Sequence, residues 1–437
     1  MKLKTFLIVG CLGGFFALNS CTAPTNEKDY SVFVNPFIGT GGHGHTFPGA
    51  VVPHGMIQPS PDTRIDGWDA CSGYYYEDST INGFSHTHVS GTGCCDYGDV
   101  LLMPTVGEQR YQTTDPQSQQ LAYSSAFSHE NETAEPGYYS VFLDTYQVKA
   151  EISATKRGAI HRYTFPESSE AGFILDLDYS LQRQTNSDMG IEVISDTEIC
   201  GHKKTTYWAF DQYINFYAKF SKPFSYTLVT DSITMDNGKR LPVCKVLLHF
   251  NTTKDEQVLV KVGISAVDIA GARKNVESEI PGWDFDKVRK NARSAWNQYL
   301  SKIDITTPDK DDKTIFYTAL YHTAISPNLF TDADGRYLGM DLEVHQGDTI
   351  NPLYTVFSLW DTFRALHPLM TIIDPDLNNQ FINSLIKKHQ EGGIYPMWDL
   401  GSNYTGTMIG YHAVPVIVDA YMKGYRNFDA KEAYKAS

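Results

Sequence analysis

The chain has 437 residues and a formal net charge of −15, and a chain of this length is expected to form two to three structural units. Aromatic residues make up 13% and charged residues 20% of the sequence, which excludes a disordered or fibrous protein because so many aromatic side chains can build a core. The negative charge argues against a protein that binds the phosphates of nucleic acid.

The N-terminus has the pattern of an export signal. An apolar run over residues 5–18 follows the short basic start, and it is too short to span a bilayer, so residues 1–20 are predicted to be a signal peptide. Ser20 directly precedes Cys21, as in the cleavage site of a bacterial lipoprotein, and we expect lipidation of Cys21. A plain secretory signal with an incidental cysteine is the alternative. We therefore expect an exported cell-envelope lipoprotein, periplasmic or at the cell surface, that meets the membrane only through this N-terminal lipid anchor.

Short β-like runs follow one another from residue 30 to about residue 268. Residues 138–143, 172–177 and 257–262 are rich in β-branched and aromatic side chains, and turn signals such as Asp236-Asn237-Gly238 separate such runs. Many strands without helical segments between them predict an antiparallel β-sandwich, which would cover residues 21–270.

The period of the apolar residues changes near Asp284 to steps of three and four. This predicts a helix over residues 285–299 with Asp284 as its N-cap, inside a helical linker that covers residues 271–305. More helices are predicted near 308–324 and at 356–373, 376–390 and 406–424, and Pro415 is expected to kink the last one. Successive helical pairs are typical of an α/α toroid, so residues 306–437 are expected to form part of one.

The region 35–99 combines glycines, histidines and aromatic residues. Glycines at this density allow the backbone to approach a ligand closely, although no phosphate-binding loop is present. His43 and His45 alternate, as do His86 and His88, so in an extended segment each pair would share a face. A zinc or copper site is one interpretation, and hydrogen-bonded histidines that line a pocket or hold a loop are the other. Vicinal Cys94-Cys95 lacks C-x-x-C spacing and is expected to provide buried thiols.

Two tryptophan–aspartate pairs stand out in the helical half, Trp360-Asp361 and Trp398-Asp399. An indole beside a carboxylate suits a sugar, because the ring packs on C–H groups and the acid accepts hydrogen bonds from hydroxyl groups. In a toroid their spacing would place both pairs at the same mouth. The alternative is a core tryptophan followed by a capping aspartate in each case; together the pairs favour a carbohydrate site.

One short acidic segment has the beginning of a calcium-binding loop. Asp332-Ala333-Asp334-Gly335 matches the first positions of such a loop but lacks the later glutamate, so a turn is expected there.

Several segments, in the same order along the chain, resemble the family 92 glycoside hydrolases. They are residues 35–50, 67–76, 83–94, 360–369 (WDTFRALHPL) and 408–424 (MIGYHAVPVIVDAYMKG). The resemblance implies a calcium-dependent, inverting exo-α-mannosidase that hydrolyses terminal α-mannosides of glycans, such as an α-1,2-mannosidase, with mannose-containing glycans as partners. It also implies an N-terminal antiparallel β-sandwich followed, over residues 306–437, by the first part of an (α/α)6 barrel, with the active site between them.

The resemblance also implies roles for individual residues. Asp361 is expected to bind mannose hydroxyls in the terminal subsite beside Trp360, and glycine-rich sandwich loops are expected to close over the same sugar. The expected sugar-binding set is Asp361, Trp360, Trp398, Trp68, Gly41, Gly42 and Cys94.

The chain departs from the family pattern in its expected catalytic groups. Aligned on Trp398 and Met408, the family's general-acid glutamate falls on Tyr404, and a phenol with a pKa of about 10 is a poor acid for a leaving alkoxide. The resemblance places the general-base aspartates and much of the calcium site in a later helical segment. The sequence therefore predicts a truncated member with impaired activity. A variant that cleaves mannosyl phosphodiesters without an acid, and a non-catalytic surface protein that binds mannan, are the alternatives.

Overall fold

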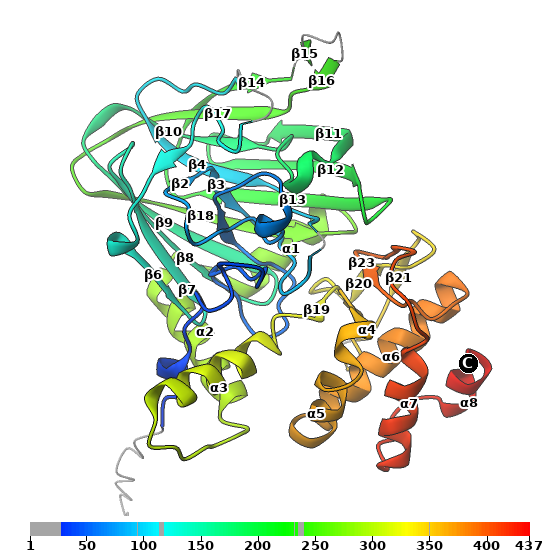
Figure 1. The fold of residues 1–437 in the computed structure, drawn as a ribbon. Coiled ribbons are helices and arrows are strands. Elements are labelled where there is room, and N and C mark those ends of the chain that lie inside the picture. The colour runs from blue at the N-terminus through cyan, green and yellow to red at the C-terminus, as the bar shows by residue number, and fades with distance from the viewer. Residues whose placement is uncertain (1–27, 94, 113–117, 231, 235–239, 349) are drawn as a thin grey trace, which may run out of the picture.

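The computed structural model describes residues 28–93, 95–112, 118–230, 232–234, 240–348 and 350–437. A β-rich part is followed by a helical part, as Figure 1 shows from blue and green to yellow and red. The expected signal peptide, its lipidation residue Cys21 and the loop residue Cys94 lie outside the described residues.

The β-rich part contains two large antiparallel sheets. One sheet has six strands in the spatial order β1 (Ser60–Asp62), β3 (Gly83–Ser85), β4 (Leu101–Val106), β10 (Ser168–Asp176), β17 (Lys245–Thr252) and β14 (Ser225–Val229). The other has eight strands in the order β11 (Thr185–Val193), β12 (Glu198–Thr206), β13 (Gln212–Phe220), β18 (Glu256–Ser265), β9 (Gly158–Phe165), β8 (Val148–Ala154), β7 (Tyr138–Leu143) and β6 (Glu132–Glu135).

Buried side chains from both sheets form one core. Tyr163 of β9 packs edge-on against Phe173 of β10, with ring centroids 5.0 Å apart, and Phe84 of β3 lies 6.2 Å from Tyr163. Because successive residues of a strand point to opposite faces, the alternating aromatic and β-branched residues fill the space between the sheets. The predicted antiparallel sandwich is confirmed.

Short two-stranded pairs occur in both parts of the chain, and 3-10 turns occur in the β-rich part. The strand pairs are β2 (Thr80–Ile81) with β5 (Ser125–Ala126), β15 (Ser232–Thr234) with β16 (Arg240–Pro242), β19 (Asn328–Leu329) with β22 (Tyr354–Thr355), β20 (Arg336–Leu338) with β21 (Val344–Gln346), and β23 (Asp399–Leu400) with β24 (Asn403–Tyr404). The 3-10 turns are η1 (Ser31–Phe33), η2 (Trp68–Ala70), η3 (His129–Asn131) and η4 (Leu181–Arg183).

Two helices lie against the eight-stranded sheet. They are α1 (Ile269–Glu279) and α2 (Phe285–Leu300), and their apolar side chains pack with Tyr138, Ile160 and Tyr217 of the sheet. The Asp284 carboxylate accepts a hydrogen bond from the Lys287 amide at 2.9 Å, so this aspartate is the N-cap of α2 as predicted.

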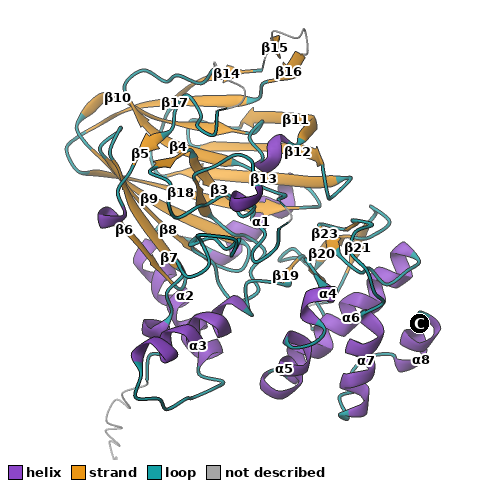
Figure 2. Ribbon diagram, viewed as in Figure 1, coloured by secondary structure: helices purple, strands orange, loops and turns teal. Residues whose placement is uncertain are grey.

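The remaining helices are α3 (Lys310–His322), α4 (Leu359–Thr362), α5 (Leu366–Ile373), α6 (Pro375–Gly392), α7 (Ala413–Met422) and α8 (Ala430–Lys435) (Figure 2). The helix predicted over 376–390 is confirmed as α6. The helix predicted over 356–373 is wrong in its extent: it begins at Leu359, since Val356 has a φ of +63°, and it is interrupted between α4 and α5. No helix of the described residues is both long and apolar enough to cross a membrane.

The last predicted helix also begins later than expected. Residues 406–412 are a loop, because Met408 and Gly410 have φ values of +65° and +96° that an α-helix does not accommodate. Pro415 is therefore the third residue of α7. Amides of the first turn have no partner within a helix, so Pro415 removes no helical hydrogen bond and the predicted kink is wrong.

Candidate functional site

Trp398 lies where the glycine-rich loops of the sandwich meet the helical part. Its indole is only 2% exposed and packs in a cluster with Val89 of the Gly/His-rich segment and Val356 before α4. Its backbone forms an isolated antiparallel bridge with Ser358. The segment that carries His86 and His88 is thereby connected to the start of α4, about 270 positions later in the chain.

The first tryptophan–aspartate pair is presented to solvent at the start of α4. Trp360 is 41% exposed and Asp361 is also exposed. The Ser358 hydroxyl donates a hydrogen bond to Oδ2 of Asp361, which orients the carboxylate and leaves its other oxygen able to accept hydrogen bonds. An oriented carboxylate beside an open indole face is the arrangement that the sugar hypothesis requires.

The second pair is buried and has structural partners. Neither Asp399 nor Lys388 is exposed, and Nζ of Lys388 lies 2.8 Å from Oδ2 of Asp399. The same carboxylate accepts hydrogen bonds from the Thr355 hydroxyl at 2.8 Å and the Phe357 amide at 3.2 Å. The expectation that both pairs open at one mouth is therefore wrong, and Trp398 is a packing residue beneath the site, because the β23 strand turns this pair inward.

Trp68 lies on the exposed surface of the glycine-rich loops. Its ring is 60% exposed and lies 4.7 Å, edge to face, from the His45 ring. A Cβ atom at Gly93 would lie 2.2 Å from the Trp68 ring, so only glycine permits this contact. The Gly91 amide donates to the His45 carbonyl at 2.7 Å, which joins the two Gly/His segments into one surface.

Gly41 and Gly42 lie on an open part of the same loop. A Cβ atom at Gly42 would have no neighbour within 4 Å, and at Gly41 it would meet only Tyr76, at 3.7 Å. Gly42 adopts a φ of +57°, which favours glycine. Gly42 is exposed and Gly41 is partly exposed, and the Gly41 carbonyl accepts a hydrogen bond from the Gly44 amide at 3.3 Å.

The paired histidines are held by hydrogen bonds. Nδ1 of His86 lies 2.6 Å from the Val100 carbonyl and its Nε2 lies 3.1 Å from Nε2 of His161; burial lowers the pKa of His86 to about 4. Nε2 of His88 lies 2.8 Å from Oδ1 of Asp62, and Nδ1 of His43 lies 2.8 Å from Oδ1 of Asp69. These partners favour the hydrogen-bonded interpretation of the histidine pairs over a zinc or copper site.

Tyr404 lies in the β23–β24 hairpin, opposite Asp399 in the strand register, and its side chain is partly exposed. The preceding residue, Asn403, binds the turn between β12 and β13: its Oδ1 accepts from the Asp211 amide at 2.9 Å and its Nδ2 donates to the Asp211 carbonyl at 3.0 Å. The sequence analysis missed this contact, and nothing near Asn403 in the sequence signals a partner so distant.

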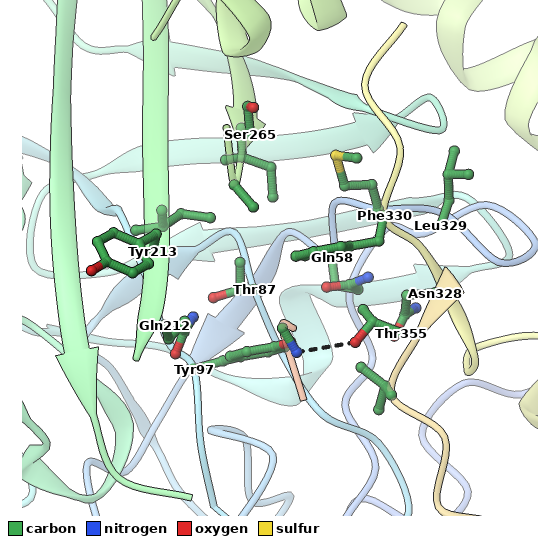
Figure 3. A pocket seen from close by; sticks show the side chains of 16 residues that line it. Gln58, Thr87, Tyr97, Gln212, Tyr213, Ser265, Asn328, Leu329, Phe330 and Thr355 are labelled. Atoms are coloured by element: carbon green, nitrogen blue, oxygen red, sulfur yellow. Dashed lines mark hydrogen bonds between the residues drawn. The ribbon is translucent and has the colours of Figure 1, made fainter. Parts of the chain in front are cut away.

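A small cavity lies at the junction of the sandwich and the helices. Gln58, Thr87, Tyr97, Gln212, Thr355 and Gly401 contribute to its wall, and the Gly401 amide donates to the Thr355 hydroxyl at 3.0 Å (Figure 3). Its volume is about 40 Å³, whereas pockets for small ligands measure roughly 300–1,000 Å³. The cavity has room for water but not for a sugar.

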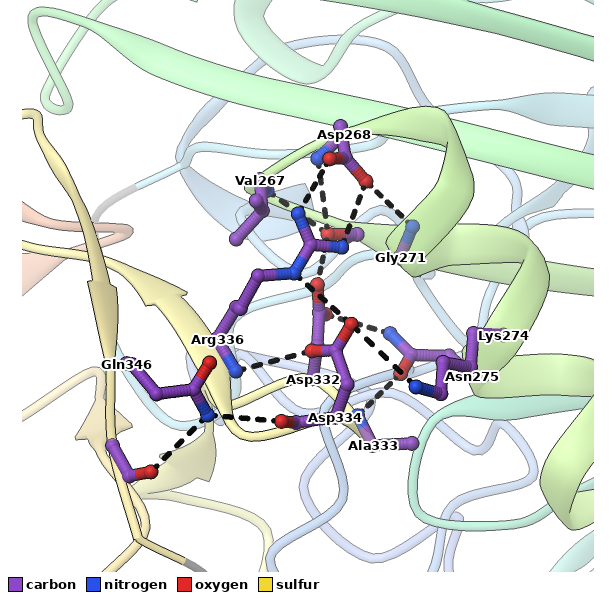
Figure 4. Close-up of polar contacts among 12 residues, drawn as sticks. Val267, Asp268, Gly271, Lys274, Asn275, Asp332, Ala333, Asp334, Arg336 and Gln346 are labelled. Carbon is purple, nitrogen blue, oxygen red and sulfur yellow. Dashed lines mark hydrogen bonds and ion pairs between the residues drawn. The ribbon is translucent and has the colours of Figure 1, made fainter.

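The calcium-like segment is a turn, as predicted. The Gly335 amide donates to the Asp332 carbonyl at 2.9 Å, and Gly335 has a φ of +88°. The guanidinium of Arg336 binds Asp334 at 3.0 Å and Asp268 at 2.6 Å, so an internal cation already neutralises these carboxylates (Figure 4). Across the described ranges, no three His, Cys, Asp or Glu side chains come together as metal ligands would. The segment 332–335 therefore does not fit a calcium ion.

Comparison with known proteins identifies the family of both parts. Residues 33–265 match the glycosyl hydrolase family 92 N-terminal domain, and residues 271–437 match the glycosyl hydrolase family 92 catalytic domain. An uncharacterized secreted glycosidase from Arthroderma benhamiae is 29% identical over 372 residues, which are 76% of this chain and 47% of that protein.

Solved structures of the family share the fold. The GH92 alpha-mannosidase BT3965 from Bacteroides thetaiotaomicron superposes with a TM-score of 0.88 at 36% identity, over 94% of this chain and 56% of that one. The inverting mannosidase BT2199 from the same organism gives 0.81 at 29% identity, over 93% and 55%. The chain thus spans about half the length of these relatives. With two domain matches that together cover most of its length, and with a sandwich followed by helices as in these structures, the chain belongs to glycosyl hydrolase family 92.

Proposed function

We propose that this chain provides the terminal-mannose site of an exo-α-mannosidase that hydrolyses terminal α-mannosides of glycans. The observation that carries the proposal is the exposed Trp360–Asp361 pair with its carboxylate oriented by Ser358. Related structures support it, since BT3965 is an alpha-mannosidase and has also been solved in complex with mannoimidazole.

The exposed groups suit the parts of a pyranose. The free oxygen of Asp361 accepts hydrogen bonds from neighbouring sugar hydroxyls, and such bonds to a charged acceptor are stronger than neutral ones. The Trp360 ring packs on the C–H face of the same sugar. Trp68 and the open backbone at Gly41 and Gly42 close the site from the sandwich side.

Binding of mannose tests this assignment. Calorimetry is expected to detect mannose binding to the wild-type chain and none to the Asp361→Ala variant. Asp376→Ala, which removes another exposed carboxylate from a helix start, is the matched control and is expected to bind mannose like the wild type. If millimolar mannose does not bind to the wild-type chain, the proposal is wrong.

Inversion and calcium dependence belong to the same proposal. An inverting glycosidase needs an acid on one side of the glycosidic bond and a base that activates water on the other, with about 6.5–9.5 Å between their carboxyl groups. Among the described residues no three His, Cys, Asp or Glu side chains come together as metal ligands would, so calcium dependence is proposed on the family resemblance. NMR of the first anomer released, and hydrolysis before and after chelation, test the two properties.

Sugar binding without hydrolysis is a second candidate function. It is favoured by Tyr404, because this residue stands at the family's general-acid position and a phenol gives up its proton too reluctantly near neutral pH. Cleavage of mannosyl phosphodiesters is the other alternative, because the phosphate can leave without receiving a proton. Preference for mannose-1-phosphoryl compounds over mannobiosides would support that alternative, and mannose binding with neither reaction would support the binding protein.

Export and a lipid anchor at Cys21 complete the proposal. The secreted relative supports export, and the Ser20-Cys21 sequence supports lipidation. Metabolic labelling with a fatty acid is expected to mark the wild type and the Cys11→Ser control but not the Cys21→Ser variant.

A further inference from the structure

We propose that the turn between β12 and β13, residues 207–211, forms the wall that binds the leaving sugar of the substrate. The inference rests on the proposed function, because it assigns the second subsite of the same site. None of the sugar-binding residues expected from the family resemblance lies in this turn. A turn in this position would help to determine which glycans are accepted.

The turn lies beside the position from which the leaving group would be released. Asn403 holds Asp211 with two hydrogen bonds, of 2.9 and 3.0 Å, and is the direct neighbour of Tyr404. Figure 1 shows the end of β12 and β13 facing the β23–β24 hairpin of the helical part. A sugar that extends from the bond near Tyr404 toward the sandwich therefore meets this turn.

The turn offers aromatic rings to solvent. Tyr207 is 42% exposed and Phe210 is 56% exposed. Trp208, between them, packs against the cluster that contains Trp398 and Tyr97, and it anchors the turn. The faces of exposed aromatic rings suit the C–H groups of a sugar ring.

The backbone of the turn is fixed before any ligand arrives. The Asp96 carboxylate accepts a hydrogen bond from the Ala209 amide at 3.0 Å, and the Thr206 hydroxyl donates to the Phe210 carbonyl at 2.9 Å. A wall that is already ordered loses little conformational entropy on binding. The chemistry favours a neutral ligand, since the only charged side chain of the turn, that of Asp211, is paired with Lys204. The geometry thus suits an uncharged hexopyranose.

The affinities for mannose and for α-1,2-mannobiose distinguish binding at this subsite from binding at the terminal one. Mannose occupies only the terminal subsite, whereas α-1,2-mannobiose occupies both. We expect wild-type protein to bind mannobiose about tenfold more tightly than mannose, as one well-packed aromatic contact provides. In Tyr207→Ala/Phe210→Ala the affinity for mannose should stay unchanged, and the affinity for mannobiose should fall to that for mannose.

Tyr226→Ala is the control, since Tyr226 is an aromatic residue with 48% exposure on β14, in the other sheet. It should keep the tenfold preference, and circular dichroism with a thermal melt establishes that each variant is folded. The inference is overturned if the double variant keeps the preference, if the wild type has none, or if the double variant loses mannose as well. Failure of the wild type to bind mannose at all would instead overturn the proposed function, and the inference with it.

Discussion

Lys388 and Asp399 form an ion pair in which neither side chain is exposed and Nζ lies 2.8 Å from Oδ2. Lys388 belongs to α6, and Asp399 begins the β23–β24 hairpin that carries Asn403 and Tyr404. The pair therefore fixes the hairpin on the helical part, while Asn403 fixes the same hairpin on the sandwich. These contacts hold the hairpin that carries Tyr404 between the helical part and the sandwich.

Removal of the Lys388 charge should destabilise the protein strongly. In Lys388→Met the Asp399 carboxylate stays buried without its cation, which costs about 3–5 kcal/mol in comparable cases. Urea denaturation followed by circular dichroism measures the loss. Lys387→Met, at the adjacent and partly exposed lysine, is the control and should change the free energy of unfolding by less than about 0.5 kcal/mol. Equal stabilities of the two variants would show that the pair is unimportant.

Loss of the Asn403 side chain should weaken binding of mannobiose more than binding of mannose. Asn403→Ala removes both hydrogen bonds to Asp211, whose backbone is partly buried, and each such bond contributes about 0.5–1.5 kcal/mol. Calorimetry with the two sugars measures the effect on the turn. Asn383→Ala removes an amide that donates to the Asn427 carbonyl at 3.0 Å, away from the turn, and should leave both affinities unchanged.

Hydrolysis by this chain should depend steeply on the leaving group. Since Tyr404 is a poor proton donor, a nitrophenyl mannoside, whose leaving group needs no proton, should be cleaved about 10²–10⁴-fold faster than α-1,2-mannobiose. Tyr404→Phe should change neither rate. A fall in the mannobiose rate alone in Tyr404→Phe would instead identify the phenol as the acid. Release of nitrophenol and of mannose is the measurement.

The contribution of Asp332 to the stability of the protein should fall as the pH rises from about 4 to about 6. Burial raises the pKa of Asp332 to about 6 in spite of the hydrogen bonds from Ser265 and Asn275. The unfolded chain, with an aspartate pKa near 3.9, loses this proton first, so the folded state holds more protons throughout the interval and its advantage shrinks by about 3 kcal/mol. Well above pH 6 both states are ionised and this contribution is constant.

Asp332→Asn should remove that part of the pH dependence. The amide has nearly the same shape but does not titrate, so the free energy of unfolding of the variant should lack the decrease that Asp332 contributes between pH 4 and pH 6. Urea denaturation at several pH values gives both curves. Asp376→Asn changes an exposed carboxylate and should reproduce the wild-type curve; identical slopes for Asp332→Asn and the wild type would contradict the assignment.

Local patterns predicted the features that depend on neighbours in sequence. Asp284 was recognisable as an N-cap because the cap and the amide it binds are three residues apart. The segment 376–390 was recognisable as a helix from its apolar period. The start of α7 was missed, because the period extends into residues whose backbone has positive φ at Met408 and Gly410, and no side-chain pattern reports that geometry.

The sequence by itself determined the order of sandwich and helices, the cap that begins α2, and the presence of the Trp360–Asp361 and Trp398–Asp399 pairs. Only the tertiary structure decided that Trp360–Asp361 is exposed while Trp398–Asp399 is buried, because burial depends on Lys388 and on the sandwich loop at Val89. It also decided the contact between Asn403 and Asp211, which are 192 positions apart. Hydrogen bonds over such a separation are set by how whole elements pack, and a local sequence pattern carries no record of them.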